Sequence, residues 1–253
     1  MAMRNTALNF SIAAIAALVL AQNGSADAQE SSHHVAWAPS YGGSCQACDL
    51  RGRNMSGWDI SRANYPDTDL SESLLRGTRA VGVVFTNAVA LNTDFRQATL
   101  DDAKFIDAHL ETSRFDKASL RNADLSRAVM TDTKLRGAIL TGATARRTDF
   151  SGALGQRADF SGANLGNARF VNAKLNNAVF YNAVLTGATF AGADLSGANL
   201  SSMRLSEVNF DGATGLETAN FENSCAAAGT ILPAGVELSP CPPLEGTFTL
   251  NFD

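Results

Sequence analysis

Large apolar residues recur at every fifth position through the middle of the chain. From Phe95 to Phe210, 22 of the 24 positions in this series hold Leu, Phe or Met, and the two exceptions are Ala145 and Gly155. A second series lies two residues earlier and holds Ala at 18 of its 24 positions. Neither an α-helix nor a plain strand keeps a period of five on one face, because their side chains repeat at about 3.6 and 2.0 residues.

A chain that runs extended for a few residues and then turns a corner keeps both series inside. The small and the large residue of each unit are two apart, so both point inward as they would in a strand. Four units close a square coil of about 20 residues, and successive coils stack at about 4.8 Å with their backbones paired. A narrow square cannot hold eight large side chains per coil, which explains the small series. The pattern therefore predicts an all-β fold, a parallel β-helix of stacked square coils.

Several units carry a more specific signature. The segments 123–127 (ADLSR), 163–167 (ANLGN) and 193–197 (ADLSG) resemble the A(D/N)Lxx motif of the pentapeptide-repeat family. This resemblance implies a right-handed quadrilateral parallel β-helix over residues 45–224, with about nine coils. Because the motif residues build the core, the resemblance specifies the fold and leaves the ligand and the activity open.

Positions one full coil apart should stack on one another, which makes the register testable. One such column predicts a ladder of four aromatic rings, Phe150, Phe170, Phe190 and Phe210. Stacked rings stabilise a core beyond the burial of their area.

The coil at 141–160 breaks the pattern, because Ala145 and Gly155 leave two large inward positions empty on one turn. One interpretation is a bulge in which Leu154 replaces the missing side chain of Gly155. The other is a pinched, basic collar that binds an anionic group or a partner. The collar would consist of Lys134, Arg136, Arg146, Arg147 and Arg157.

The N-terminus has the features of an export signal. Arg4 supplies a positive charge, a short apolar stretch follows, and a small-x-small pattern predicts cleavage between Ala28 and Gln29. We therefore expect a signal peptide at 1–28, a flexible leader at 29–44 and a periplasmic or secreted protein. No second hydrophobic stretch follows, so no stable membrane span is expected after cleavage.

Four cysteines fall in pairs near the two ends of the repeat region. An even count in an exported chain favours disulfides, here Cys45–Cys48 and Cys225–Cys241. The C-x-x-C pair leaves a redox or metal-handling role as an alternative. Residues 225–253 lack the repeat and are rich in proline, and the alternation around Phe248 predicts one last strand. This segment should cap the open edge, and an end-to-end homodimer is the alternative.

Charge and motif content exclude several classes of function. Residues 50–200 hold 18 Lys and Arg against 15 Asp and Glu, which is far from the dense negative charge needed to mimic duplex DNA. We expect no nucleic-acid partner, no catalytic residues, no metal and no cofactor, because tight corners leave no concave site and no nucleophile–base pair is evident. The sequence thus favours an exported, non-catalytic scaffold or protein-interaction module whose partner is an unknown protein or envelope polymer. The first alternative is an anionic-polymer binder acting through the collar, and the second is a redox or metal-handling accessory.

Overall fold

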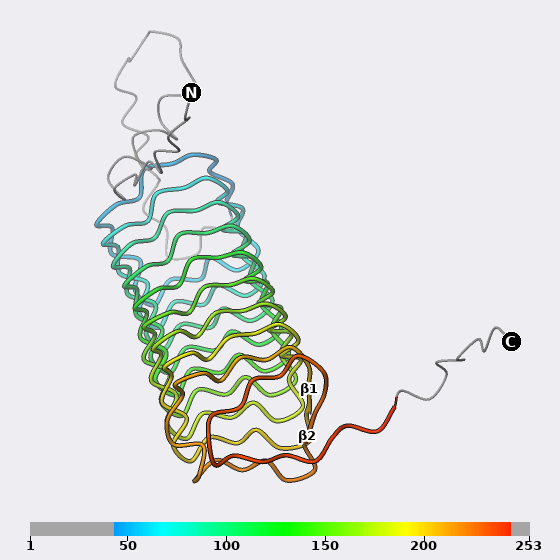
Figure 1. The fold of residues 1–253 in the computed structure, drawn as a ribbon. Helices are drawn as coiled ribbons and strands as arrows, with labels where there is room; N and C mark the ends of the chain where they lie inside the picture. Colours follow the sequence, from blue (N-terminus) through cyan, green and yellow to red (C-terminus); the bar gives the residue numbers. More distant parts are fainter. Residues whose placement is uncertain (1–42, 244–253) are drawn as a thin grey trace, which may run out of the picture. The chain divides into compact units, whose positions relative to one another are not determined.

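The computed structural model describes residues 43–243, which wind into a stack of four-sided coils (Figure 1). Parallel bridges join each coil to the next, from Ser44↔Asn64 to Asp194↔Thr214. Most sides contribute a single bridge, so the described part contains just two named strands, β1 (Arg204–Leu205) and β2 (Cys225–Ala226). No helix that could cross a membrane occurs among residues 43–243.

Some expectations concern other parts of the chain. The signal segment 1–28, most of the leader 29–44 and the final strand near Phe248 lie outside the described residues. Pairing begins at Ser44, the last residue assigned to the leader.

Each side of a coil repeats one set of backbone hydrogen bonds. On the side centred at Leu100, the amides of Leu100 and Asp102 donate to Ser119 O and Arg121 O of the next coil, at 2.7 and 2.8 Å. The amide of Ala103 closes the corner on Leu100 O at 3.1 Å. The backbone of a narrow coil is thereby paired above and below, as a buried polar backbone requires.

Every corner demands an unusual backbone conformation. The residue two places after the large inward residue of each unit has a positive φ, as at Asn122 (56°), Asp132 (56°) and Gly142 (69°). Glycine reaches this left-handed region without strain, and Asn and Asp reach it more easily than other side chains. The recurrence of Gly, Asn and Asp at these positions therefore specifies the corners, as the apolar series specifies the sides.

The predicted ladder of four phenylalanines is confirmed. Its three successive ring pairs, Phe150–Phe170, Phe170–Phe190 and Phe190–Phe210, have centroids 4.9, 4.9 and 5.2 Å apart and interplanar angles of 9°, 2° and 12°. A second ladder, Phe160–Phe180, stacks at 5.0 Å. The rings of the two ladders meet edge to face, so their phenylalanines form one continuous aromatic cluster inside these coils.

Most threonine and serine side chains at the small inward positions donate a hydrogen bond to a backbone carbonyl, usually of the preceding coil. Thr93 Oγ1 donates to Leu70 O at 2.8 Å, and Thr148 Oγ1 donates to Leu125 O at 2.7 Å. Both side chains are fully buried. A buried hydroxyl with a partner costs little, so these threonines replace alanine without disturbing the coil, whereas Ser73 Oγ is buried and has no partner in the structure.

The coil at 141–160 is regular, so the bulge interpretation was wrong. Leu154 remains at an outward position and bridges Lys174, while the Gly155 amide donates to Lys174 O at 2.8 Å. The space beside Gly155 is filled from the next coil, because a Cβ added there would lie 2.9 Å from Leu175 Cδ2. The missing side chain is compensated by a neighbour along the stack, with no change of backbone register.

The register shifts near the C-terminal end. Gly215 occupies an inward position, Leu216 is buried, and the pairs beyond them are more widely spaced along the chain, as in Asn199↔Asn220 and Asn209↔Ile231. β1 pairs with β2 in parallel, with Arg204 opposite Cys225.

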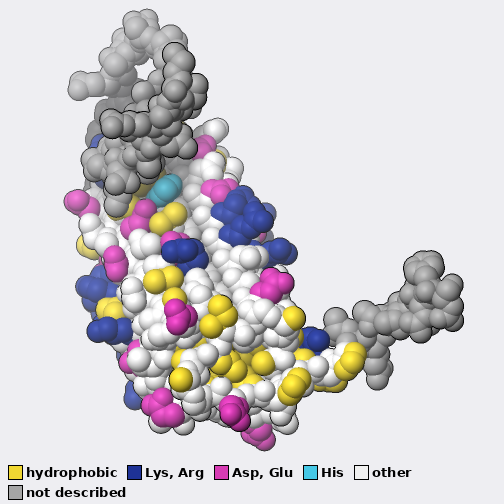
Figure 2. All heavy atoms as spheres, in the orientation of Figure 1, with side chains coloured by type: hydrophobic (Ala, Val, Ile, Leu, Met, Phe, Trp, Pro, Cys, Tyr) yellow, Lys and Arg dark blue, Asp and Glu magenta, His cyan; other side chains and the backbone are white. Residues whose placement is uncertain are grey.

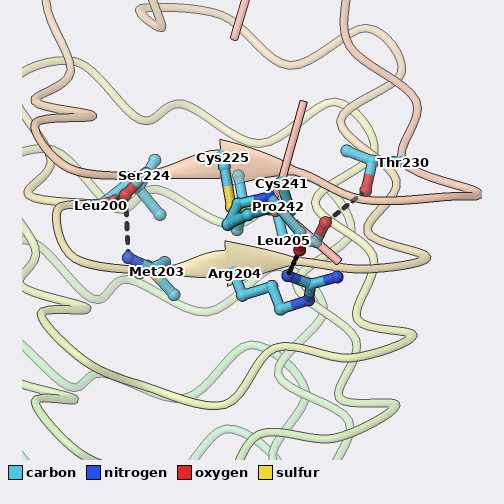
Figure 3. The surroundings of a disulfide bond; sticks show 9 residues. All are labelled: Leu200, Met203, Arg204, Leu205, Ser224, Cys225, Thr230, Cys241 and Pro242. Atoms are coloured by element: carbon cyan, nitrogen blue, oxygen red, sulfur yellow. Dashed lines mark hydrogen bonds between the residues drawn. A yellow bond between two sulfur atoms is a disulfide. The ribbon is translucent and has the colours of Figure 1, made fainter. Parts of the chain in front are cut away.

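A proline-rich segment then lies along β2. Ala226 bridges Pro240, and the Cys225–Cys241 disulfide joins the two segments with a Cα–Cα distance of 4.8 Å (Figure 3). Arg204 Nη1 donates to Pro242 O at 2.8 Å, so the last described residues are attached to β1 as well.

One side of the stack is interrupted just before this end. No bridge joins Val184 to Arg204, although the equivalent pairs in the preceding described coils are formed. The hydrogen bonds that would run from Leu185 N to Arg204 O and from Arg204 N to Ala183 O are missing. Tyr181 and Val184 lie beside this gap with about half of their surface exposed, at 50% and 51%.

Candidate functional site

The two cysteine pairs occupy opposite ends of the described stack. Cys45 and Cys48 form a disulfide across a corner of the first coil, between the bridges made by Ser44 and Asp49, with a Cα–Cα distance of 5.7 Å. Positive φ at Ala47 shows that a corner, rather than a helix N-terminus, separates the two sulfurs. The pair therefore lacks the helix N-terminus that lowers thiol pKa in many redox motifs. Among residues 43–243 no cluster of His, Cys, Asp and Glu is arranged to hold a metal ion.

The predicted collar residues do not form one surface. We number the four sides by their inward columns, which begin at Leu50, Met55, Ile60 and Tyr65. Lys134 lies on side 2, and Arg136 and Arg157 lie at the corner between sides 2 and 3. Arg146 and Arg147 lie at the corner between sides 4 and 1, which is diagonally opposite. The structure thus brings three of the five together and separates the other two.

Arg136 and Arg157 belong to a longer series of cations. The corner between sides 2 and 3 carries one cation on each of five successive coils. We call this series the basic corner; it comprises Arg76, Arg96, Lys117, Arg136 and Arg157. Its first three members were not among the predicted collar residues, because the collar was predicted from the irregular coil rather than from the outward columns. Their recurrence once per coil was the signal that would have found them.

Two shallow depressions adjoin along the basic corner. One, of about 250 Å³, is lined by Arg76, Arg96, Gln97, Arg114, Asp116 and Lys117. The other, of about 490 Å³, is lined by Lys117, Arg136, Gly137, Gln156, Arg157, Asn176 and Asn177. Lys117 borders both, so the two form one interrupted groove running along the stack. Figure 2 shows Lys and Arg side chains gathered in separate clusters on the face in view, with polar and backbone surface between them.

Acidic neighbours engage some of these cations. Asp94 accepts hydrogen bonds from the Arg96 side chain, with Nε–Oδ1 at 2.7 Å. Burial raises the pKa of Asp94, but the side-chain and backbone hydrogen bonds from Arg96 outweigh it and hold the pKa below its ordinary value. Asp116 Oδ1 lies 3.5 Å from Arg136 Nη1. No ion pair involves Arg76, Lys117 or Arg157 among the described residues, so these charges face solvent.

Side 1 carries a different polar pair. His109 Nδ1 lies 3.2 Å from Glu111 Oε1, and this hydrogen bond raises the pKa of His109 above its ordinary value of 6.5 despite partial burial. Glu111 Oε2 is buried and has no hydrogen-bond partner in the structure. The ring contacts a carboxylate rather than a serine or cysteine, which is not the arrangement of a nucleophile with its base.

Short extended sides, left-handed corners and parallel pairing of each coil with the next define a four-sided β-solenoid. A family model described as pentapeptide repeats matches in 8 copies, in segments that together extend from 67 to 225. The chain therefore belongs to the pentapeptide repeat family. Right-handed quadrilateral β-helices are the fold of this family, and the coils in Figure 1 have this four-sided form.

Solved structures of the same family are similar. HetL, a pentapeptide repeat protein involved in heterocyst differentiation regulation in the cyanobacterium Nostoc sp. strain PCC 7120, is 28% identical, with 76% of this chain and 90% of that chain covered and a TM-score of 0.42. QnrB1, a plasmid-mediated fluoroquinolone resistance protein, is 19% identical, with 73% and 91% covered and a TM-score of 0.43. A pentapeptide repeat protein from the Arabidopsis thaliana thylakoid lumen is 24% identical, with 47% and 67% covered and a TM-score of 0.29. Among curated proteins, none matches.

Proposed function

We propose that this protein is an exported, non-catalytic scaffold that binds a partner along the sides of its solenoid. The observation that carries the proposal is the separation between apolar inward positions and polar outward positions. Most large apolar side chains between 50 and 210 are buried in the core, whereas the outward positions carry mostly polar or charged groups. Such a surface offers long regular faces and shallow grooves, whereas small-molecule enzymes use enclosed pockets with convergent groups.

Export is supported by the signal-like N-terminus and by the cysteines. Both described pairs are bridged, and no free cysteine occurs among residues 43–243. Disulfides form and persist in oxidising compartments such as the periplasm and the cell exterior. A periplasmic or secreted location fits this chemistry.

The proposal extends to the two ends of the solenoid. We assign about nine coils to residues 45–224 and a cap to residues 225–253, in which the Cys225–Cys241 disulfide holds the closing segment over the last coil. A covered end prevents edge-to-edge association, which open β-edges otherwise promote. The variant Cys241→Ser should therefore self-associate, as measured by light scattering at increasing concentration. Unchanged monomers at all concentrations would argue against the cap.

Cross-linking in the producing cell tests the binding role. The full chain with its own N-terminus would be expressed, a photo-reactive residue placed at outward positions such as Thr99 or Thr189, and cross-linked products identified. We expect the mature chain outside the cytoplasm and side-specific adducts with one partner or envelope polymer. Retention in the cytoplasm would refute export, and absence of any side-specific adduct would refute the scaffold role.

A thiol count separates the redox alternative from the scaffold. The exported protein should expose no reactive thiol under native conditions, because both described cysteine pairs are bridged. Two reactive thiols at Cys45 and Cys48 would instead favour a redox or metal-handling accessory.

A further inference from the structure

The basic corner presents charge with the regularity of the coils themselves. Its five cations occur one per coil, and coils stack at about 4.8 Å, so the series extends over about 19 Å. Arg76, Arg96 and Arg136 occupy the first corner position, whereas Lys117 and Arg157 occupy the second. The result is a slightly staggered line of positive charge parallel to the stack.

Side 2 together with the basic corner that follows it is also the most positive surface of the described stack. Between residues 74 and 177, the outward positions of side 2 and its following corner hold eight Lys or Arg and two Asp, a net charge of +6. The corresponding positions of sides 1, 3 and 4 carry −2, −1 and +2. The whole chain is at −5, so the positive charge is concentrated on one line against an acidic background. A concentrated field of this kind attracts and orients anionic ligands.

Polar amides lie between the cations of the groove. Gln97 borders one depression, and Gln156, Asn176 and Asn177 border the other. Gln156 Oε1 is buried and has no hydrogen-bond partner in the structure. A buried acceptor of this kind calls for a donor from a ligand or solvent, and a hydroxyl group supplies one.

We propose that the basic corner binds a linear acidic polysaccharide lying along the stack. Carboxylates on successive sugars meet the line of cations, and sugar hydroxyls meet the side-chain amides, including the acceptor of Gln156. Single-stranded nucleic acid is less well matched, because its usual platform is a row of aromatic side chains. No aromatic residue lines either depression.

This inference names the partner class of the proposed scaffold and rests on that role, but its test does not depend on export. Purified full-length protein would be titrated into fluorescently labelled oligogalacturonate, with binding followed by anisotropy at about 50 and 200 mM salt. Neutral dextran, oligo(dT) and polyphosphate serve as comparison ligands. Oligomers longer than the series should bind more tightly than the disaccharide.

Matched variants locate the site. The test variant is Lys117→Glu, Arg136→Glu and Arg157→Glu together. The control is Lys104→Glu, Arg146→Glu and Arg147→Glu on side 4 and its corner, with the same change of charge. Glu tolerates the left-handed corner positions, because Glu72 and Glu207 already occupy them with φ of 62° and 56°. A third variant, Lys117→Gln, Arg136→Gln and Arg157→Gln together, keeps the test valid if charge reversal prevents folding.

We expect the dissociation constant for oligogalacturonate to rise about tenfold or more in the test variant and to stay within about twofold in the control. If both variants bound oligogalacturonate equally weakly, binding would depend only on the net charge of the protein, which would overturn the proposal. Tighter binding of oligo(dT) or polyphosphate would overturn the choice of ligand. Failure of every anion to bind would refute the groove while leaving the scaffold role to the cross-linking experiment.

Discussion

Gly155 offers a sharp test of how the core is packed. The repeat calls for Leu at this position, so restoring the motif with Gly155→Leu would be expected to stabilise the coil if each unit were independent. The structure predicts the opposite. A Cβ at this position already approaches Leu175 Cδ2 to 2.9 Å, so the rest of a leucine side chain would enter space that Leu175 occupies. Overpacking of this kind costs about 1–3 kcal/mol.

A double-mutant cycle separates this clash from other effects. Leu175→Ala alone should cost about 2–5 kcal/mol, because it opens a cavity beside Gly155. Adding Gly155→Leu to it should refill that cavity, so the pair should cost about 1–3 kcal/mol less than the sum of the singles. The matched control is Leu195→Ala, in the same column one coil further from Gly155, which should be additive with Gly155→Leu within about 0.5 kcal/mol.

The measurement is equilibrium urea unfolding followed by circular dichroism, with the slope of the transition compared across variants. Solenoids can lose cooperativity, so equal slopes are required before free energies are compared. A Gly155→Leu variant more stable than the parent, or strict additivity with Leu175→Ala, would refute the account of shared space between coils.

Three further predictions concern other parts of the stack. Phe170→Ala should lower the unfolding free energy by about 3–5 kcal/mol. Phe170→Leu should lower it by less, because this change loses ring stacking but little volume. Equal losses for the two variants in urea unfolding would contradict this account of the ladder. At the left-handed corner residue Asn122, Asn122→Val should lower the unfolding free energy by about 1–2 kcal/mol and Asn122→Gly by only about a few tenths of a kcal/mol. The thermal unfolding midpoints should follow the same ranking. Because Glu111 raises the pKa of His109 above 6.5, their interaction contributes stability that is complete below about pH 6.5 and is lost as pH rises through the raised value. In Glu111→Gln the His109 pKa should fall toward 6.5 in an NMR titration, and an unchanged value would exclude the carboxylate as the cause.

The fold followed from the sequence because two inward positions in every five are fixed by volume. The ladder from Phe150 to Phe210 could be predicted from spacing alone, since stacking in a solenoid depends only on the repeat length. Gly155 could not, because the choice between a bulge and compensation from the next coil depends on the rotamer of Leu175. The predicted collar was wrong for a related reason. It joined cations that are close in sequence, such as Arg136 and Arg146, although cations of the same column are the ones that lie close in space.

The outward surface follows different rules from the core. Inward positions are constrained by packing in each coil, so one unit predicts the next. Outward positions are free of that constraint. Their charges form a pattern only when equivalent positions are compared from one coil to the next. Lys117 and Arg157 illustrate this, since neither stands out in its own unit and both border the same groove.

The gap between Val184 and Arg204 separates two properties that normally go together in a solenoid. The side chain of Leu185 is almost completely buried, yet its amide lacks the cross-coil bond that its counterparts make. Amide protection in hydrogen exchange depends on hydrogen bonding and local opening, whereas side-chain burial governs packing. The stack is therefore continuous as a packed core but discontinuous as a hydrogen-bonded ladder on that side. On that side, the Leu185 amide should exchange with solvent faster than the amides at equivalent positions in the preceding coils.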